Sequence, residues 1–313
     1  MSNGFILHED SQRVIIATGF STPSDNRKTG DMIQVWILVK ACNPVEAIKA
    51  GLDRLICGNC RHRGDGSGKE RSCYVNAGQA PLGIWRAWKA GRYPTLQFMD
   101  GFAGRRVRFG AYGDPTHIPL PLALAIAGVS SGHTGYTHQW RKPSLQAWRS
   151  ILMASVDSVA ELVIARSMGW STFRVGSEAS VGEQLCASDR IGTPCSVCLL
   201  CAGARGGLES VHIPPHGKGA VHFKRGCPVI DQFKRKMERD SLKSSVGRAM
   251  FCPRCENLMD WRTSVEFSVW ESETGKCATV RAMCAPCWDG VRALVTKPSV
   301  KYRVDLIDGR TLR

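Results

Sequence analysis

Seven of the fourteen cysteines gather in two clusters whose spacing could hold metal. The first cluster has the pattern C-x2-C-x12-C, and the second places four thiols between residues 186 and 201. Their members are Cys57, Cys60 and Cys73, and Cys186, Cys195, Cys198 and Cys201. Thiolates bind zinc, iron and iron–sulfur clusters, and spacing alone does not separate these metals. We expect both clusters to be metal ligands.

The first cluster is compatible with two kinds of metal site. Three thiolates leave one coordination position free, which is what catalysis at a metal or cluster requires. His62 lies two residues after Cys60 and could be a fourth ligand, which would close a zinc site instead.

The chain reads as a cytoplasmic protein. Its first thirteen residues lack a basic segment followed by an apolar core, the pattern of a secretory signal. No run approaches the ~18 apolar residues that span a bilayer, so we expect no membrane association. Because the cytosol keeps thiols reduced, fourteen cysteines are expected to bind metal rather than form disulfides.

The charge is strongly basic. There are 42 lysines and arginines against 27 acidic residues, a net charge of +15. Such an excess favours polyanionic partners, nucleic acid first. An apolar content of 43% is ordinary for a globular protein with a real core, which argues against a disordered chain.

The elements that must position the cysteines alternate between strands and helices. Six short segments are typical of strands: 32–39, 105–111, 132–140, 152–156, 171–175 and 210–214. Helical patterns occupy 43–51, 81–91, 120–129, 144–150 and 158–168. This alternation implies parallel strands joined by right-handed crossovers. We predict an α/β fold in which residues 1–225 form a partial (β/α)6 barrel of parallel strands, with a doubly wound open sheet as the second choice.

Polar residues follow four successive predicted strands, which favours a site at their carboxyl ends. Glycine lets backbone approach a ligand closely, and the Asp114 carboxylate can accept hydrogen bonds from an amine or a ribose. The candidates for cofactor binding are Gly110, Gly113, Asp114, Ser155 and Arg174, and those for acid–base catalysis are Asp114, His138 and Asp157. Asp157 could alternatively cap the following helix.

The C-terminal part has a different character. A basic connector, residues 226–250, precedes a β-rich module at 251–313. The module carries two C-x-x-C pairs: Cys252 with Cys255, and Cys284 with Cys287. Four thiolates suit a closed, structural zinc site, so we predict a zinc-ribbon-like module. The spacer between the pairs is longer than usual, and we expect a hairpin inserted in it.

Residues 32–217 resemble the radical S-adenosylmethionine superfamily, with six βα units, three cysteines after the first strand and a glycine-plus-acid motif, Gly110 to Asp114, after the second. The resemblance implies a [4Fe–4S] cluster on Cys57, Cys60 and Cys73 and an auxiliary cluster on the second group. It also implies that Gly110, Gly113 and Asp114 meet the methionine end of S-adenosylmethionine. The superfamily usually has C-x3-C-x2-C with an aromatic residue before the last cysteine, whereas here Tyr74 follows Cys73.

The phrases CGNCRHRG, RSCYVNAGQAP, FGAYGDP, GYTHQW and LMASVDS are similar to an uncharacterised family of bacteriophages and plasmids. Members are sometimes labelled rolling-circle replication proteins. This resemblance implies a location in the host cytoplasm. The His-hydrophobe-His motif of such replication proteins is incomplete here, since the segment Val211 to Ile213 holds one histidine.

Three functions fit these patterns. The first choice is a radical-S-adenosylmethionine-like iron–sulfur enzyme that acts on nucleic acid or a nucleotide. The alternative is a zinc-stabilised nucleic-acid-binding protein involved in phage or plasmid replication, without redox chemistry. A third is a zinc-using transferase or hydrolase, with Asp114 or Asp157 and His138 as its acid–base groups.

Overall fold

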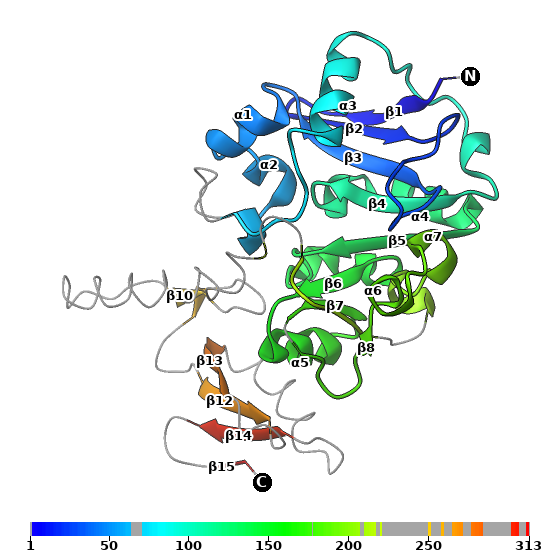
Figure 1. The fold of residues 1–313 in the computed structure, drawn as a ribbon. Coiled ribbons are helices and arrows are strands. Elements are labelled where there is room, and N and C mark those ends of the chain that lie inside the picture. The colour runs from blue at the N-terminus through cyan, green and yellow to red at the C-terminus, as the bar shows by residue number, and fades with distance from the viewer. Residues whose placement is uncertain are drawn as a thin grey trace.

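The fold is known from a computed structural model, which describes residues 2–63, 71–176, 178–206, 210–216 and 220, and beyond them strands β10 to β15. Figure 1 shows one large twisted sheet that runs from the N-terminal strands, in blue, to β8, in green. The strand order is β1-β2-β3-β4-β5-β6-β7-β9-β8. The bounds are β1 Gly4–Glu9, β2 Arg13–Thr18, β3 Ile33–Val39, β4 Arg106–Tyr112, β5 Gly132–Thr137, β6 Met153–Val156, β7 Thr172–Val175, β8 Gln184–Leu185 and β9 Ser210–Ile213.

The six predicted strands are confirmed as β3, β4, β5, β6, β7 and β9. They are neighbours in chain order, and every pairing among them is parallel. β3 is buried along its whole length, as expected of a strand covered on both faces. The coarse prediction of an α/β fold with a mostly parallel sheet is therefore right. Among the described residues no pairing joins β1 to β8, so the strands form an open sheet in which barrel closure is not shown.

The N-terminal hairpin was not predicted, because residues 1–30 read as mixed and polar. β1 and β2 pair antiparallel, and β2 pairs antiparallel with β3, so the sheet is extended on this side. The turn is held by Asp10, whose Oδ1 accepts hydrogen bonds from the backbone N–H groups of Gln12 and Arg13. The apolar run from Val14 to Ala17 is fully buried. It is only four residues long and has polar residues on both sides, so its sequence alone did not predict a strand.

Four of the five predicted helices are α-helices close to their expected positions, whereas three short α-helices were not predicted. Their bounds are α1 Pro44–Lys49, α2 Arg54–Cys57, α3 Ala80–Lys89, α4 Leu120–Val129, α5 Val159–Ser167, α6 Ala187–Ile191 and α7 Cys195–Cys198, with 3-10 turns η1 Arg61–Arg63, η2 Asp100–Phe102, η3 Pro115–His117, η4 Pro143–Ser150 and η5 Gly203–Gly206. α1 begins with a capping box between Asn43 and Glu46, as its sequence indicates. The segment predicted as a helix at 144–150 is the 3-10 turn η4. Within the described residues, no helix has the length and apolar character needed to cross a membrane.

Strand alternation divides the side chains of the six parallel strands between two faces. One face packs into the main core, where Ile37, Phe109 and Val156 are fully buried. The other face lines the large cavity described below. On β7, Phe173 and Val175 lie on the cavity face, so their neighbour Arg174 lies on the opposite face.

Arg174 is consequently a structural residue in this fold rather than part of the cavity lining. Its guanidinium forms an ion pair with Glu183, with an Nη2–Oε2 distance of 2.6 Å, and donates to the backbone oxygen of Glu178. Both side chains of the pair are almost completely buried.

Replacing Glu183 with glutamine should destabilise the fold by about 3 kcal/mol, because it leaves the Arg174 charge buried without its counter-ion. Urea unfolding would measure the loss. Asp189→Asn, which removes an exposed carboxylate from α6, is the matched control and should change the free energy of unfolding by less than about 0.5 kcal/mol. Equal effects of the two substitutions would contradict a structural role for the pair.

The C-terminal strands are β10 Met250–Phe251, β11 Leu258–Met259, β12 Val265–Glu271, β13 Cys277–Met283, β14 Tyr302–Leu306 and β15 Thr311–Leu312. β12 and β13 pair antiparallel, so a strand pair lies within the long spacer, as predicted. Cys252, Cys255, Cys284 and Cys287 lie outside the described residues, as does nearly all of the predicted connector at 226–250.

Candidate functional site

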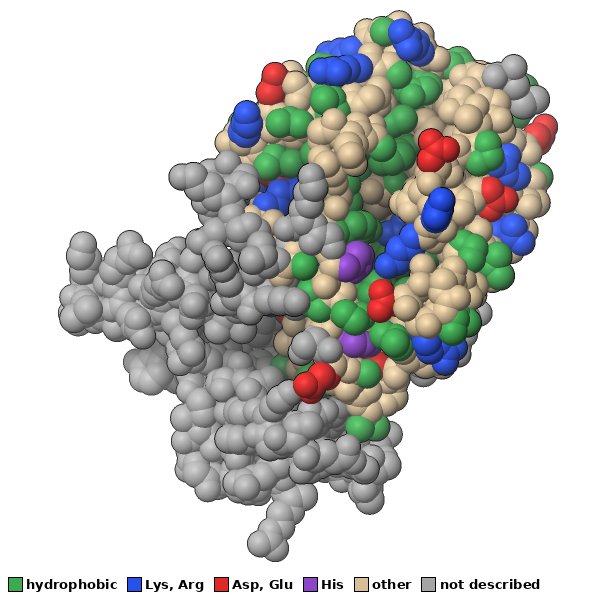
Figure 2. Space-filling view, viewed as in Figure 1, with side chains coloured by type: hydrophobic (Ala, Val, Ile, Leu, Met, Phe, Trp, Pro, Cys, Tyr) green, Lys and Arg blue, Asp and Glu red, His purple; other side chains and the backbone are tan. Residues whose placement is uncertain are grey.

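All seven cysteines of the two clusters line one cavity of about 450 Å³. The cavity also receives side chains from every one of the six parallel strands, among them Trp36, Tyr136 and Ser155. On the face seen in Figure 2 the described part of the molecule is hollowed, with histidine and basic side chains beside hydrophobic ones. The structure therefore brings together two groups that are more than a hundred residues apart in the chain.

The first cluster sits directly after the short helix α2. Cys57 is the last residue of α2. The backbone N–H of Cys73 donates a hydrogen bond to the carbonyl of His62, which brings Cys73 back beside the segment that follows Cys57 and Cys60. Burial, followed by the proximity of the Cys73 thiol, raises the pKa of Cys57 well above its usual range. Burial and the neighbouring thiols of Cys57 and Cys73 do the same to Cys60. The thiols of Cys57 and Cys60 are therefore protonated at neutral pH, and the Cys73 thiol lies within electrostatic reach of both.

The second cluster lies on the crossover between β7 and β9. The backbone N–H of Cys195 donates to Lys28 and the carbonyl of Cys201 accepts from Gly135, which ties this segment across the cavity. Burial raises the pKa of Cys201 to about 12, although a hydrogen bond with Tyr136 opposes the shift. Burial also raises the pKa of Cys195.

The described cysteine sulfurs are not gathered as closely as the ligands of a single zinc ion. Zinc bound at ~2.3 Å to each thiolate holds the sulfur atoms roughly 3.8 Å apart. In the part of the chain that the structure describes, no three cysteine sulfurs lie within 4.8 Å of one another. The eight described cysteines are free thiols.

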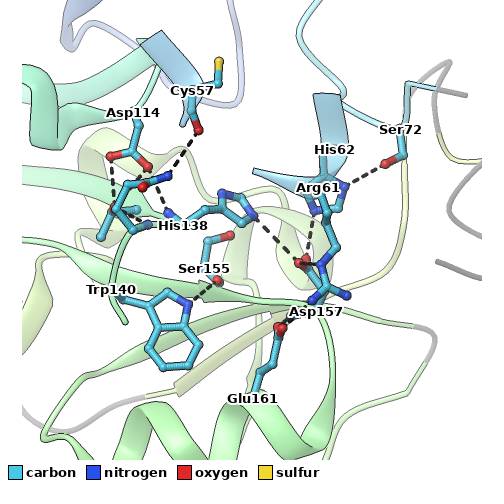
Figure 3. Close-up of polar contacts among 12 residues, drawn as sticks. Cys57, Arg61, His62, Ser72, Asp114, His138, Trp140, Ser155, Asp157 and Glu161 are labelled. Atoms are coloured by element: carbon cyan, nitrogen blue, oxygen red, sulfur yellow. Dashed lines mark hydrogen bonds and ion pairs between the residues drawn. The ribbon is translucent and has the colours of Figure 1, made fainter. Parts of the chain in front are cut away.

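His62, His138 and Asp157 meet at the edge of the cavity (Figure 3). His62 lies in η1, and the other two follow β5 and β6. The Nε2 atom of His62 lies 2.8 Å from Asp157 Oδ1, and its Nδ1 atom lies 2.8 Å from Ser72 Oγ. His138 Nε2 is 3.9 Å from Asp157 Oδ2. Both ring nitrogens of His62 therefore have partners other than the thiols, which is not the arrangement expected of a fourth ligand to the first cluster.

The charges around Asp157 keep its carboxylate ionised. Burial alone would raise the pKa of Asp157, but the hydrogen bond and charge of His62, with the charge of Arg61, hold it below its usual range. Arg61 Nε lies 2.9 Å from Asp157 Oδ2, and Arg61 also pairs with Glu161. Burial lowers the pKa of His138 to about 3, with Asp157 opposing, so this imidazole is neutral at neutral pH.

Asp157 does not cap the helix that follows it. Ser158 takes that position, and its hydroxyl accepts from the backbone N–H of Glu161. The Glu161 carboxylate in turn accepts from the backbone N–H of Asp157. The local structure thus leaves the carboxylate of Asp157 to face the two histidines.

Asp114 is part of the support for this group. Its carboxylate is buried and accepts hydrogen bonds from the backbone and hydroxyl of Thr116, the hydroxyl of Thr137 and the backbone N–H of His138. Burial raises the pKa of Asp114, and these hydrogen bonds oppose the shift. With its oxygens fully used within the chain, Asp114 positions His138 by its backbone and caps η3.

The other predicted cofactor-binding residues differ in their surroundings. Gly110 and Gly113 border the cavity and have φ angles of +70° and +83°, a conformation that favours glycine. A Cβ atom at either position would meet protein atoms at 2.8 Å, Pro115 for Gly110 and Ile37 for Gly113, so both glycines serve the close packing of the turn. Ser155 is buried and lines the cavity.

Arg108 is a cavity residue to which the sequence analysis gave no role. It is buried in the middle of β4, and its guanidinium hydrogen-bonds the hydroxyls of Tyr74 and Tyr136 at 2.9 and 3.4 Å and lies over the Tyr136 ring. These side-chain partners are hydroxyl groups rather than carboxylates. Its place on the same face as Gly110 was a usable signal, since residues two apart in a strand share a face.

No family model, curated protein or solved structure matches this chain.

Proposed function

We propose that this chain is a radical-S-adenosylmethionine-like iron–sulfur enzyme that acts on a nucleotide or nucleic acid, with the cysteine-lined cavity as its active site. The observation that carries the proposal is the convergence of seven thiols from two clusters on one cavity above six consecutive parallel strands. Cysteines that serve only to pack a hydrophobic core are not expected to line one cavity together.

The cavity lining supports a sheet that curves as a partial barrel. The lining residues on the strands follow the two-residue alternation except on β4, where Ala111 also borders the cavity. They are Gln34 and Trp36, Arg108, Gly110, Ala111 and Tyr112, Thr134 and Tyr136, Phe173 and Val175, and Val211 and Ile213. Five strands, joined by Ser155 of β6, thus turn one face toward a common space. A flat sheet would spread these faces apart, so we infer that the six strands bend around the cavity.

The donor set fits a [4Fe–4S] cluster on Cys57, Cys60 and Cys73. Three thiols without a fourth protein ligand would leave one iron open, and such a cluster supplies an open coordination position and one-electron chemistry when bound. Cys186, Cys195, Cys198 and Cys201 would hold a second, auxiliary cluster. S-adenosylmethionine would meet the backbone of the Gly110–Gly113 turn and the Ser155 side chain.

The substrate is expected to carry a negative charge. Arg108 presents a buried cation to the cavity, and burying a charge beside neutral partners costs free energy that an anionic ligand would recover. A phosphate group matches both this guanidinium and the overall charge of +15. The C-terminal module would hold zinc through its four cysteines.

The test is to purify the full chain without oxygen and to quantify iron, sulfide and zinc together with the absorption spectrum. About eight irons with matching sulfide, plus one zinc, are expected for two clusters and a ribbon. About four irons would restrict the proposal to one cluster. Zinc without iron, even after reconstitution with iron and sulfide, would overturn it.

Metal loading should depend steeply on pH. The pKa values of Cys57, Cys60, Cys195 and Cys201 are raised above their ordinary values, so these thiols are protonated at neutral pH and must release protons when metal binds. The apparent affinity for iron should therefore rise between pH 6.5 and 8.5, by about tenfold per pH unit for each proton released. Iron uptake at several pH values would show this, and uptake independent of pH would contradict thiolate ligation.

A zinc-stabilised nucleic-acid-binding protein is the second candidate, favoured by the charge of +15. It predicts zinc alone and an affinity for nucleic acid that falls steeply with salt. On the face in Figure 2 the lysine and arginine side chains are scattered over the described surface rather than gathered in one patch.

A further inference from the structure

We propose that His62, His138 and Asp157 form a mononuclear metal site, separate from the cysteine clusters, that binds a divalent transition metal through two imidazoles and one carboxylate. One ligand atom of each residue lies within 4.8 Å of the others, a spacing that, among the described residues, this group alone meets. Figure 3 shows the His138 ring and Asp157 facing one another, with His62 beside them.

The distances suit a bound ion with small movements of the side chains. A metal about 2.1 Å from each nitrogen and oxygen holds its ligand atoms about 3.0 to 3.4 Å apart. The two distances in the structure, 2.8 Å from His62 Nε2 to Asp157 Oδ1 and 3.9 Å from His138 Nε2 to Asp157 Oδ2, lie on either side of that range. All three ligand atoms already lie within 4.8 Å of one another, and a bound ion would draw His138 Nε2 and an oxygen of Asp157 closer together.

A second observation points independently to a ligand. The Nε2 atom of His138 is buried and has no hydrogen-bond partner. Buried polar nitrogens of native proteins are nearly always paired, and of the eight buried side-chain atoms without a partner in the described residues, this one alone belongs to the group of three. An imidazole nitrogen without a hydrogen-bond partner can offer its lone pair to a metal ion at this position.

Each ligand is held by a neighbour, as metal ligands usually are. Ser72 Oγ contacts Nδ1 of His62 at 2.8 Å, the carboxylate of Asp114 fixes the backbone of His138, and Arg61 holds Oδ2 of Asp157 at 2.9 Å. These contacts leave His62 Nε2 and Asp157 Oδ1 directed at one another. The metal would take the place of the proton between them, with the His62 proton carried on Nδ1 toward Ser72.

The chemistry of the three ligands limits which metals the site would bind. Two imidazoles and a carboxylate with open positions are typical of non-haem iron(II) sites and also suit zinc and manganese. His62 and His138 both line the cavity, so the open positions of the ion would face the same space as the thiols. The site would thus place a second kind of metal beside the first cysteine cluster.

Manganese(II) is the probe of choice, because it has little preference for thiolates and is observed directly by electron paramagnetic resonance. We expect the full wild-type chain to bind about one Mn²⁺, with spin-echo modulation from histidine nitrogen. His138→Gln and Asp157→Asn should weaken binding by about tenfold or more and, for the former, reduce the nitrogen signal. His117→Gln should leave both unchanged, since His117 contacts Arg13 and does not belong to the group.

Several results would overturn the site. These are the absence of bound Mn²⁺, binding without histidine-nitrogen modulation, or the same affinity in the His138 variant as in the wild type. Should the His138 variant fail to fold, the nitrogen signal of the wild-type chain and the His62→Asn variant decide the question. Iron and sulfide content, measured on the same preparations, tests the cysteine clusters separately, so the two proposals can fail independently.

Discussion

A Cys57→Ser chain purified without oxygen is expected to carry about four fewer irons than the wild type, and to lose any activity that needs the first cluster. Serine nearly matches cysteine in size, but its hydroxyl does not ionise to a thiolate at neutral pH. Cys57 is partly buried at the end of α2, where its thiol faces the cavity and lies near that of Cys73. Its loss leaves two thiols, too few to hold the cluster.

Cys42→Ser is the matched control. Cys42 is a free, half-buried thiol that does not line the cavity. The iron content of the Cys42→Ser protein should therefore equal that of the wild type. Cys198→Ser should remove iron from the second cluster while leaving the first in place. Unchanged iron in both the Cys57 and the Cys198 variants would mean that the two groups of thiols do not hold iron.

The elements of the fold follow from local sequence signals. The run from Ile33 to Val39 is continuously apolar, and the pattern Asn43-Pro44 with Glu46 marks the start of a helix, so both are readable without tertiary contacts. The parallel arrangement follows from the alternation of strands and helices. The hairpin of β1 and β2 was missed because its buried run is four residues long and has polar residues on both sides.

The roles of the polar residues depend on contacts that no local pattern specifies. Asp114 was predicted to meet a ligand, yet its oxygens are taken by Thr116, Thr137 and the backbone of His138. His62 was considered only as a ligand to the first cluster, because its partner Asp157 is 95 residues away. Arg174 is the residue whose position could have been predicted locally, because the two-residue period of β7 places it on the face opposite Phe173 and Val175.

Replacing Arg108 with methionine should weaken binding of a phosphate-bearing ligand by about thirtyfold or more, and leave the fold as stable as the wild type or more so. The first effect follows because removing one partner of a buried charge pair costs about 2 kcal/mol or more. The second follows because the guanidinium is buried beside two tyrosine hydroxyls and removal of such a charge relieves its desolvation. Calorimetric titration with adenosine monophosphate and with inorganic phosphate, and thermal unfolding, would measure the two.

Arg54→Met is the control that changes the net charge by the same amount. Arg54 is exposed on α2 and lies outside the cavity lining. Its loss should change the affinity for either ligand by no more than about twofold and should leave the stability unchanged.

Arg108 also lies within electrostatic reach of Cys195, whose thiolate in a metal-bound cluster would carry negative charge. An Arg108 variant that loses iron but binds the phosphate probes as tightly as the wild type would assign the guanidinium to the second cluster and remove it from substrate binding.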